Sequence, residues 1–319
     1  MTGPVIYGLS NEAYHHEAPF SEYLSSSQLK LYLKSPKAAK FALDNPTDEK
    51  SDALRFGSLF HDLMACMAEH NGDWDAVKHW RFHYAVFEPP LNPKGQPFGK
   101  TTKAYLEAYA NFEKENADLI IATQEELNLA HDMCHSLWCK SGATSEQVCK
   151  LLKWAKEVET SYFYETEDGI KLKVRPDLMT RDKIVDWKTT NLDTLDEDNI
   201  AKAIIKYRYD VSLSMYQYVV HEITGKWYKP ILVFVQKTEP HDAIMADISE
   251  WCYQYDEIDD FVKPGVGAME FRKLLDLHTE CVRNNEWPGA ESTIEADGNT
   301  RIMKPSVPYW LGMKYFEEF

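Results

Sequence analysis

Three consecutive segments near the middle of the chain alternate polar and apolar residues, and they constrain the fold more than any other feature. The segments read EVETSYFYE from residue 157, IKLKVRPDLM from residue 170 and KIVDWKT from residue 183. A period of two residues is typical of β-strands, and Asp168-Gly169 and Thr180-Arg181-Asp182 between them are turn sequences. The chain must therefore build a sheet here, with an apolar face that other elements have to cover.

The second and third segments predict a hairpin whose polar face carries carboxylates. If the turn is centred between Arg181 and Asp182, Asp177 stands directly opposite Asp186. Opposed residues of a hairpin have Cβ atoms roughly 4.5–5.5 Å apart. Lys188 shares the face of Asp186, because alternate residues of a strand point the same way. This register places two carboxylates and a cation in one small region.

Two facing carboxylates repel each other, and a divalent cation between them would turn that repulsion into binding. Magnesium favours a few carboxylates together with water and phosphate oxygens, and Mn²⁺ is expected to substitute for it. Lys188 would lie beside the metal, where it could orient a water molecule or stabilise charge on a reacting phosphate. An Asp-x-Lys triplet alone is common; its place in a hairpin after Pro176-Asp177 is what makes the pattern informative.

The segments on either side of the hairpin predict an α/β fold. Periodicity and capping residues predict helices over 28–44 (broken near Pro36), 52–69, 101–116, 123–140, 145–155, 193–207, 211–223 and 265–284, and strands over 228–237 and 241–247. We expect a central mixed β-sheet flanked by helices, plus a helical N-terminal part. We interpret 1–319 as one elaborated domain, in which 1–156 is mainly helical, 157–250 is the α/β core and 251–319 is a C-terminal helix and tail.

Composition narrows the function classes. The 319 residues are 44% hydrophobic and 13% aromatic, which is typical of a folded chain. The formal net charge of −16 argues against passive, charge-driven binding of nucleic acid. Residues 170–188 nevertheless hold six Lys and Arg against three Asp. Residues 239–260 hold eight Asp and Glu and no Lys or Arg, which fits a solvated face or a wall that repels DNA from unproductive sites.

The N-terminal sequence indicates a cytoplasmic protein. The first residues, MTGPVIYGLSNEAYHHE, lack the basic region and apolar run of a signal peptide. No stretch approaches the ~20 apolar residues that span a bilayer, so we expect no membrane association. The six cysteines form no CxxC pair, which favours reduced thiols over a zinc site.

Several motifs together resemble the PD-(D/E)xK nuclease superfamily. Pro176-Asp177 matches the first half of its signature, and Asp186-Trp187-Lys188 matches the second. Within the superfamily, the chain is similar to the RecE type, the exonuclease VIII family of phage and prophage recombination systems. The further segments that carry this likeness are Ser25-Ser26-Ser27-Gln28-Leu29 with Ser35-Pro36, Phe56-Gly57-Ser58-Leu59-Phe60-His61, Trp287-Pro288-Gly289 and Pro308-Tyr309-Trp310.

The resemblance implies a restriction-endonuclease-like core and a set of metal ligands. His61 would bind the metal with Asp177, Asp186 and the backbone carbonyl of Trp187. Gly57 lies four residues before His61 on one helix face and would allow a close approach to the sheet. A lone helical histidine is otherwise more often a hydrogen-bonded core residue. Glu159 resembles a family acidic residue that binds a second metal or supports the first, and an exposed strand glutamate is equally compatible with the sequence.

Other residues of the same motifs are candidates for contacts with DNA. Arg175 falls on the polar face of the second strand and would contact phosphate. Ser25 and Ser27 would hold a terminal phosphate, although helix capping explains these serines equally well. Tyr216 matches the tyrosine of a family Gln-x-x-x-Tyr motif, but Ser212 stands where the glutamine belongs. The missing contact would then be weaker or supplied by another group, such as Gln217.

The resemblance also implies an activity and partners. It implies Mg²⁺-dependent degradation of duplex DNA from free 5′ ends, leaving 3′ single-stranded overhangs for strand annealing. It implies a ring-shaped homo-oligomer, with a tetramer favoured, and a RecT-type single-strand annealing protein as partner. Two other functions stay open from the sequence. One is an endonucleolytic or structure-specific nuclease of the same superfamily, and the other is a catalytically inactive DNA-binding protein.

Overall fold

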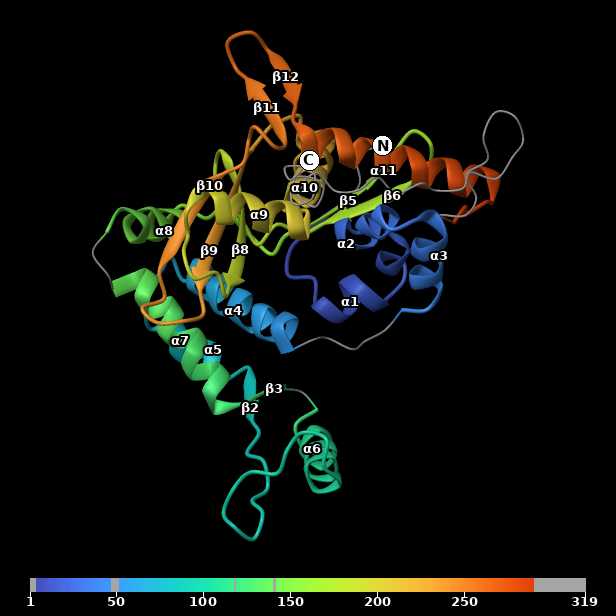
Figure 1. Ribbon diagram of the computed structural model, residues 1–319. Coiled ribbons are helices and arrows are strands. Elements are labelled where there is room, and N and C mark those ends of the chain that lie inside the picture. Colours follow the sequence, from blue (N-terminus) through green and yellow to red (C-terminus); the bar gives the residue numbers. More distant parts are fainter. Residues whose placement is uncertain (1–3, 47–51, 118, 140–141, 290–319) are drawn as a thin grey trace, which may run out of the picture.

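The computed structural model describes residues 4–46, 52–117, 119–139 and 142–289. Its N-terminal half is mainly helical, as the sequence predicts (Figure 1). The short elements at the start are β1 (Val5–Ile6), α1 (Asn11–His16), the 3₁₀ turn η1 (Phe20–Glu22), α2 (Ser26–Leu29), the 3₁₀ turn η2 (Lys30–Leu33) and α3 (Pro36–Asp44). They are followed by α4 (Asp52–Glu69), α5 (Ala76–Arg81), β2 (Tyr84–Val86), α6 (Lys103–Glu115), β3 (Ile120–Ala122), α7 (Gln124–Cys139) and α8 (Ala143–Lys153).

The second half holds most of the strands. These are β4 (Glu157–Val158), β5 (Ser161–Glu165), β6 (Lys171–Val174), β7 (Leu178–Met179), β8 (Lys183–Thr190), β9 (Lys229–Gln236), β10 (Ala243–Asp247), β11 (Tyr253–Asp256) and β12 (Phe261–Pro264). The helices between and after them are α9 (Glu197–Tyr207), α10 (Tyr209–Thr224) and α11 (Val266–Asn284). The predicted helices and the two predicted late strands are confirmed, with ends that move by a few residues.

The central sheet is mixed, and its hairpin has the predicted register. Its strand order is β10-β9-β8-β7-β4, in which β8 and β9 are parallel and the other neighbours are antiparallel. Leu178 pairs with Val185, and the Thr180 amide donates to the Lys183 carbonyl across the turn. Each of these pairs has the same residue-number sum as Asp177 and Asp186. The assumed turn centre is therefore confirmed, and Asp177 directly precedes the first paired residue of β7.

The first two predicted strands are each broken in the middle, which the alternation did not indicate. Residues after β4 and β6 leave one sheet and join another: β4 pairs with β7 in the central sheet, whereas β5 pairs with β6 in a small sheet of order β1-β5-β6. Glu159 has a positive φ of 46° at the first break, and Pro176 stands at the second. The Glu159 amide donates to the Asp177 carbonyl, so both crossings occur at one seam.

Two hydrophobic cores lie on opposite faces of the central sheet. Ile184, Leu232 and Phe234 face the first core, which includes buried residues of α9, α10, α11 and the small sheet. Val185 and Trp187 face the second core, which includes buried residues of α4, α7 and α8. Asp186 therefore lies on the face of Ile184, because alternate strand residues share a face. Helices thus pack on both faces of the sheet around β8, the strand that carries Asp186 and Lys188.

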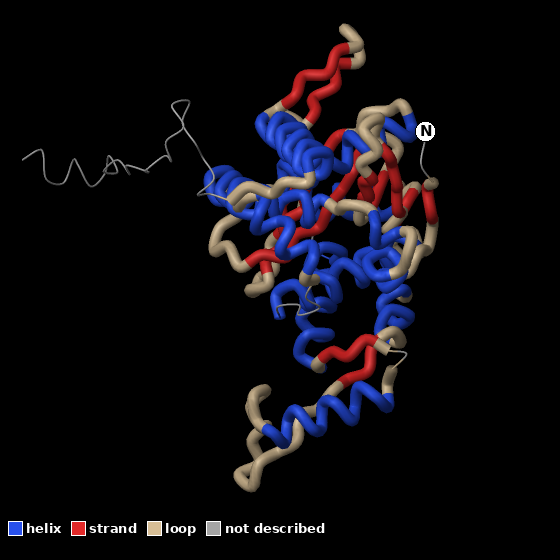
Figure 2. The backbone as a smooth tube through the Cα atoms, turned by 90° about the vertical axis from the view of Figure 1, so that its right-hand side faces the viewer, coloured by secondary structure: helices blue, strands red, loops and turns tan. Residues whose placement is uncertain are grey.

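Two segments project from this body. One is the β11–β12 hairpin, which the sequence did not predict; the other is an arm formed by the parallel pair β2–β3, a loop and α6, of which the helix was predicted and the strand pair was not (Figure 2). Both appear clear of the layered core in the two ribbon views. No helix of the described residues is both long and apolar enough to cross a bilayer.

Candidate active site

Asp177 is held at the seam between the two sheets by a backbone donor and a histidine. Its Oδ2 accepts a hydrogen bond from the Trp187 amide at 2.7 Å. The same oxygen lies 3.3 Å from Nδ1 of His61, which projects from α4. The N–H and C=O of one strand residue point to the same edge, so the Trp187 carbonyl also faces the side of Asp177. The structure thus brings together three of the predicted metal-site residues.

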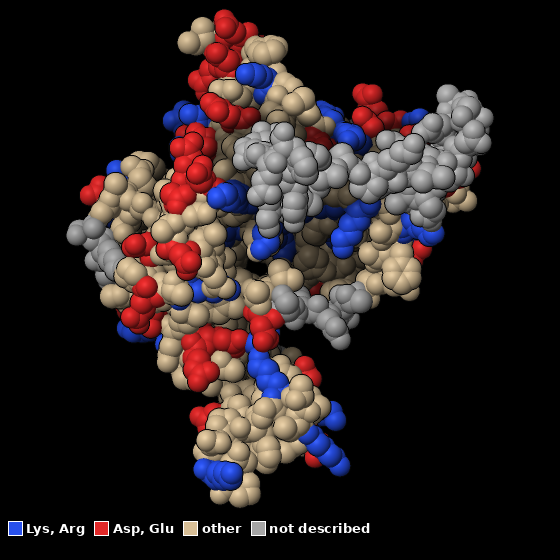
Figure 3. Space-filling view, in the orientation of Figure 1, with Lys and Arg blue, Asp and Glu red and all other residues tan. Residues whose placement is uncertain are grey.

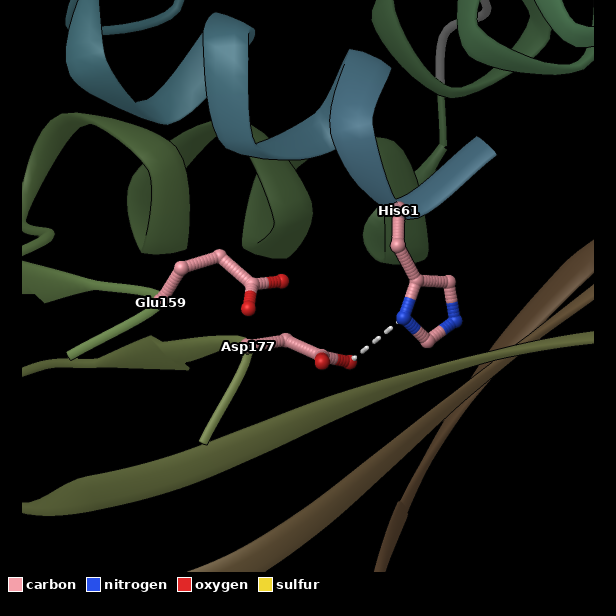
Figure 4. Close-up of side chains that lie close together, drawn as sticks. All are labelled: His61, Glu159 and Asp177. Atoms are coloured by element: carbon pink, nitrogen blue, oxygen red, sulfur yellow. Dashed lines mark ion pairs between the residues drawn. The ribbon is translucent and has the colours of Figure 1, made fainter. Parts of the chain in front are cut away.

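Glu159 completes a cluster that fits a divalent cation. One ligand atom each from His61, Glu159 and Asp177 lie within 4.8 Å of one another, from α4 and from the two chain crossings (Figure 4). Two carboxylates and an imidazole suit a divalent ion that also takes water and phosphate oxygens as ligands. Burial, and then the charge of Asp177, raise the pKa of Glu159 to about 8. A nearby divalent charge would reverse that effect and favour the ionised ligand.

Asp186 and Lys188 form a pair on β8 beside this cluster. The Lys188 ammonium is ion-paired with Oδ2 of Asp186, and both side chains are largely buried, at 19% and 9% exposure. The ammonium also lies 4.9 Å from the centre of the Tyr209 ring, a cation–π contact. Asp186 is outside the 4.8 Å cluster. Its predicted role as a metal ligand stays a prediction, and its carboxylate holds Lys188 at the site.

The charges at this site shift one another's protonation. Burial lowers the pKa of His61, but the charge of Asp177 and its hydrogen bond outweigh burial and raise it. Burial raises the pKa of Asp186, and the nearby Asp177 charge adds to this. Burial lowers the pKa of Lys188, but the charges of Asp186 and Asp177 outweigh it and keep the ammonium protonated. Carboxylates crowded in this way are typical of functional sites.

These residues open into a cavity of about 580 Å³. Its walls come from residues 8–15 and 25–30 of the N-terminal segment, from α4, from the two chain crossings and from the start of α10. Figure 3 shows Lys and Arg side chains around a hollow at the centre of one face, and acidic side chains over the projecting β11–β12 hairpin. The charge separation expected from the sequence is therefore visible on the surface.

The match to a protein family places this geometry in context. A family described as a PDDEXK-like domain of unknown function (DUF3799) matches residues 25–296. The chain belongs to this family. Its α/β fold with a mixed sheet and flanking helices is that of a PDDEXK-like nuclease domain, as the sequence predicted. The match spans every residue of the cluster and of the Asp186–Lys188 pair.

The chain was also compared with curated proteins and with solved structures. No curated protein matches the chain. Among solved structures, a candidate exonuclease from Eubacterium rectale matches with a TM-score of 0.49 and 15% sequence identity, over 95% of this chain and 97% of that one. A likeness this distant carries no argument about activity.

The cations of the second strand have a structural use in this PDDEXK-like domain. Arg175 lines the cavity, but its guanidinium donates to Ser161 Oγ, Asn11 Oδ1 and the Leu9 carbonyl. Lys173 is buried and donates to the carbonyls of Tyr14 and Phe20. Both therefore anchor the N-terminal segment to the small sheet. A phosphate contact by Arg175 stays a prediction, and it would have to use the remaining donor capacity of the group.

The serine motif serves as a helix cap and also lines the cavity. Ser25 forms a capping box with Gln28 at the start of α2, which confirms the capping interpretation. Ser25 and Ser27 share a 3.0 Å hydrogen bond, and both line the cavity. Phosphate binding by these serines remains open to test.

Tyr216 lines the cavity as expected, but Gln217 does not replace the missing glutamine. Burial, and then the Asp186 charge, raise the pKa of the Tyr216 hydroxyl well above its usual value. Gln217 is buried on the other side of α10, where it bonds to the backbone of Tyr228 and Tyr253. Neighbouring helix positions point in different directions, so Gln217 cannot reach the cavity. Ser212 itself lines the cavity.

The structure also corrects one expectation and leaves another outside its range. A Cβ on Gly57 would meet no described atom within 4 Å, so this glycine does not permit a close approach to the sheet. Trp287 donates to the Tyr32 hydroxyl at 3.3 Å, which ties the first C-terminal motif to η2. Pro308-Tyr309-Trp310 lies outside the described residues.

Sequence reasoning missed Lys30 as a site residue. This side chain lines the cavity next to the serine motif. The signal was present, because Ser27 and Lys30 are three residues apart and share a helix face. Its significance depended on knowing that α2 packs against α10 and shares a cavity with β8, which periodicity does not reveal.

Proposed function

We propose that this protein is a Mg²⁺-dependent DNA nuclease that hydrolyses phosphodiester bonds in the cavity between α4 and β8. One observation carries the proposal: the crowded His61, Glu159 and Asp177 cluster and the Lys188 ammonium line the same cavity. Buried carboxylates that repel each other cost stability unless they bind something positive. The PDDEXK-like family membership supports the same reading.

The mechanism follows from what each residue can do in place. His61, Glu159 and Asp177 would hold the ion, with Asp186 and the Trp187 carbonyl as further candidates. A bound divalent ion supplies Lewis-acid stabilisation of phosphate charge and lowers the pKa of a bound water. Lys188, kept protonated by Asp186, stabilises charge on the reacting phosphate or orients the attacking water. Trp187 fixes one oxygen of Asp177, so this ligand is oriented before substrate arrives.

Within this function, we favour an exonuclease of the RecE type acting on duplex ends. The motif order along the chain supports this choice, as does a cavity walled on one side by the N-terminal segment. The same resemblance supports 5′ to 3′ degradation, a ring-shaped oligomer and a RecT-type annealing partner. A ring would confine positive potential to a channel in a protein of net charge −16.

The deciding experiment measures acid-soluble nucleotide release from linear 5′-phosphorylated duplex DNA. It compares Mg²⁺ with EDTA, and wild type with Lys188→Ala. Lys183→Ala is the matched control, because Lys183 lies at the other end of β8 and is ion-paired with Asp182 at the turn. We expect release that requires Mg²⁺ and Lys188 but not Lys183. No release under any condition would refute the enzyme.

Two further substrates separate the finer proposals. Closed circular duplex should resist the enzyme, and its cleavage would indicate an endonuclease instead. A duplex blocked at its 5′ ends should resist as well, whereas a duplex blocked at its 3′ ends should be digested. The reverse result would overturn the assigned polarity. Light scattering of the purified protein tests the ring, because a monomer would contradict it.

A further inference from the structure

Four Lys and Arg side chains line the active-site cavity, and three of them have anchoring partners. Lys173 and Arg175 hold the N-terminal segment, and Lys188 is paired with Asp186. Lys30 differs. Among the described residues, its ammonium contacts the Tyr207 carbonyl at 3.1 Å and no carboxylate within ion-pair distance. In the described part of the chain, Lys173 also has only neutral acceptors, but it has two of them and is buried, whereas Lys30 has one and is half-exposed.

The position of Lys30 relates it to one side of the site. It directly follows α2 and begins η2, so it continues the wall that Ser25 and Ser27 form. The charges that act on it most are those of Lys188 and Asp186. The His61, Glu159 and Asp177 cluster is not among its main electrostatic neighbours. The geometry agrees: Lys30 contacts the Tyr207 carbonyl, the Tyr207 ring stacks on Tyr209, and the Lys188 ammonium lies over the Tyr209 ring. Lys30 therefore flanks the site on the side of Lys188.

The energetics of this position favour an anionic ligand. The side chain of Lys30 is half-buried, and among the described residues its ammonium has one neutral acceptor and no carboxylate within ion-pair distance, so its charge lacks a close counter-charge. Burial, and then the positive charge of Lys188, lower the pKa of Lys30 to about 8. A phosphate group would supply the missing charge and accept the free N–H donors. Lys34, one turn further along, is exposed to solvent.

We propose that Lys30 binds the phosphate next to the scissile one and so fixes the register of the cut strand. The inference rests on the proposed function in one respect, that a DNA strand occupies this cavity. The scissile phosphate belongs between the metal cluster and Lys188. A second cation on the side of Lys188 is placed for the following phosphate of the same strand. Lys30 thus contributes to binding and positioning, whereas Lys188 acts on the reacting group.

The test is a double-mutant cycle between Lys30 and single phosphates of the substrate. A series of fluorescent duplex oligonucleotides each carries one uncharged methylphosphonate, at successive linkages from the 5′ end of one strand. Dissociation constants are measured in Ca²⁺, a hard cation that occupies oxygen sites, and each sample is checked for the absence of cleavage. The proteins are wild type, Lys30→Gln, Lys30→Met, Lys30→Arg and the control Lys34→Gln.

The expected result is coupling at one linkage. Lys30→Gln and Lys30→Met should each weaken binding of unmodified DNA roughly tenfold, the size of a lost charge-assisted hydrogen bond. One methylphosphonate, next to the scissile linkage, should weaken wild type by about as much and these variants no further. Lys30→Arg should retain most of the affinity, and Lys34→Gln should match wild type.

Three results would overturn the proposal. One is wild-type affinity in Lys30→Gln. Another is a loss that multiplies with the methylphosphonate loss at every linkage. The third is an equal loss in Lys34→Gln, which would indicate only a general charge effect. Failure of the nuclease assignment is visible separately, as intact unmodified DNA after incubation of wild type with Mg²⁺. The binding cycle would still decide the role of Lys30 in that case.

Discussion

The two ends of the segment 171–179 carry polar residues on alternating positions but put them to opposite uses. At one end, Lys173 and Arg175 donate hydrogen bonds to carbonyl and hydroxyl acceptors, so their N–H donors have partners within the protein. At the other end, Asp177 lies among His61 and Glu159, and its carboxylate is crowded by a second one. The two cations stabilise the fold through their hydrogen bonds, whereas the crowded carboxylates are placed to bind a positively charged ligand. The contrast can be measured by neutralising each end.

The largest expected effect is on nuclease activity, and it comes from neutralising Asp177 at the crowded end of the segment. Asp177→Asn keeps an oxygen that can accept from the Trp187 amide but removes a negative charge from the metal cluster. We expect nuclease activity to fall roughly 10²–10³-fold or more, because charge stabilisation at the phosphate is lost. The urea midpoint should fall only slightly, because the variant loses the attraction between Asp177 and His61 together with the repulsion between Asp177 and Glu159.

The control for that change is Asp182→Asn, at the exposed turn of the same hairpin. Its activity should equal that of wild type. A large loss of stability in Asp177→Asn would show that this carboxylate is part of the fold instead, and the comparison of the two ends would fail.

Neutralising the satisfied end should lower stability instead of activity. Arg175→Met leaves Ser161, Asn11 and the Leu9 carbonyl without their donor. Unsatisfied buried groups of this kind cost about 2–4 kcal/mol in the free energy of unfolding. Urea denaturation measures this loss, and the folded fraction should retain its nuclease activity.

Lys171→Met is the matched control, because Lys171 lies on the same strand and pairs with Glu22 at the surface. Its stability should change by less than about 1 kcal/mol. If Arg175→Met were as stable as wild type but inactive, Arg175 would belong with the site residues as a phosphate contact.

The smallest effect concerns the pH dependence of stability. Burial, and then the charge of Arg175, lower the pKa of Lys173 to about 8 in the folded protein. Between that pH and the ordinary lysine pKa of about 10.4, the unfolded chain binds more protons than the folded one. Stability contributed by this group therefore rises with pH across the window. Lys173→Met should flatten the rise of the urea midpoint between pH 8 and 10, and equal slopes would contradict it.

The sequence predicted the hairpin register. It did not predict which groups the charged residues beside the hairpin, Arg175 and Glu159, would contact. The turn at residues 180–182 is local, so an assumed turn centre was enough to predict the pairing of β7 with β8. The use of Arg175 depends on Leu9 and Asn11, which are far away in the chain. The place of Glu159 depends on a positive φ that no propensity assigns to glutamate. Features set by neighbouring residues could be predicted from the sequence, whereas contacts between distant segments could not.

The seam at which two strands change sheets makes the candidate site depend on both hydrophobic cores. His61 belongs to a helix packed in the second core, whereas the small sheet beyond the seam belongs to the first. The His61, Glu159 and Asp177 cluster therefore draws its residues from segments that pack in different cores. If the proposed nuclease activity is correct, a chain in which only one core had folded would lack a complete site and should not cut DNA.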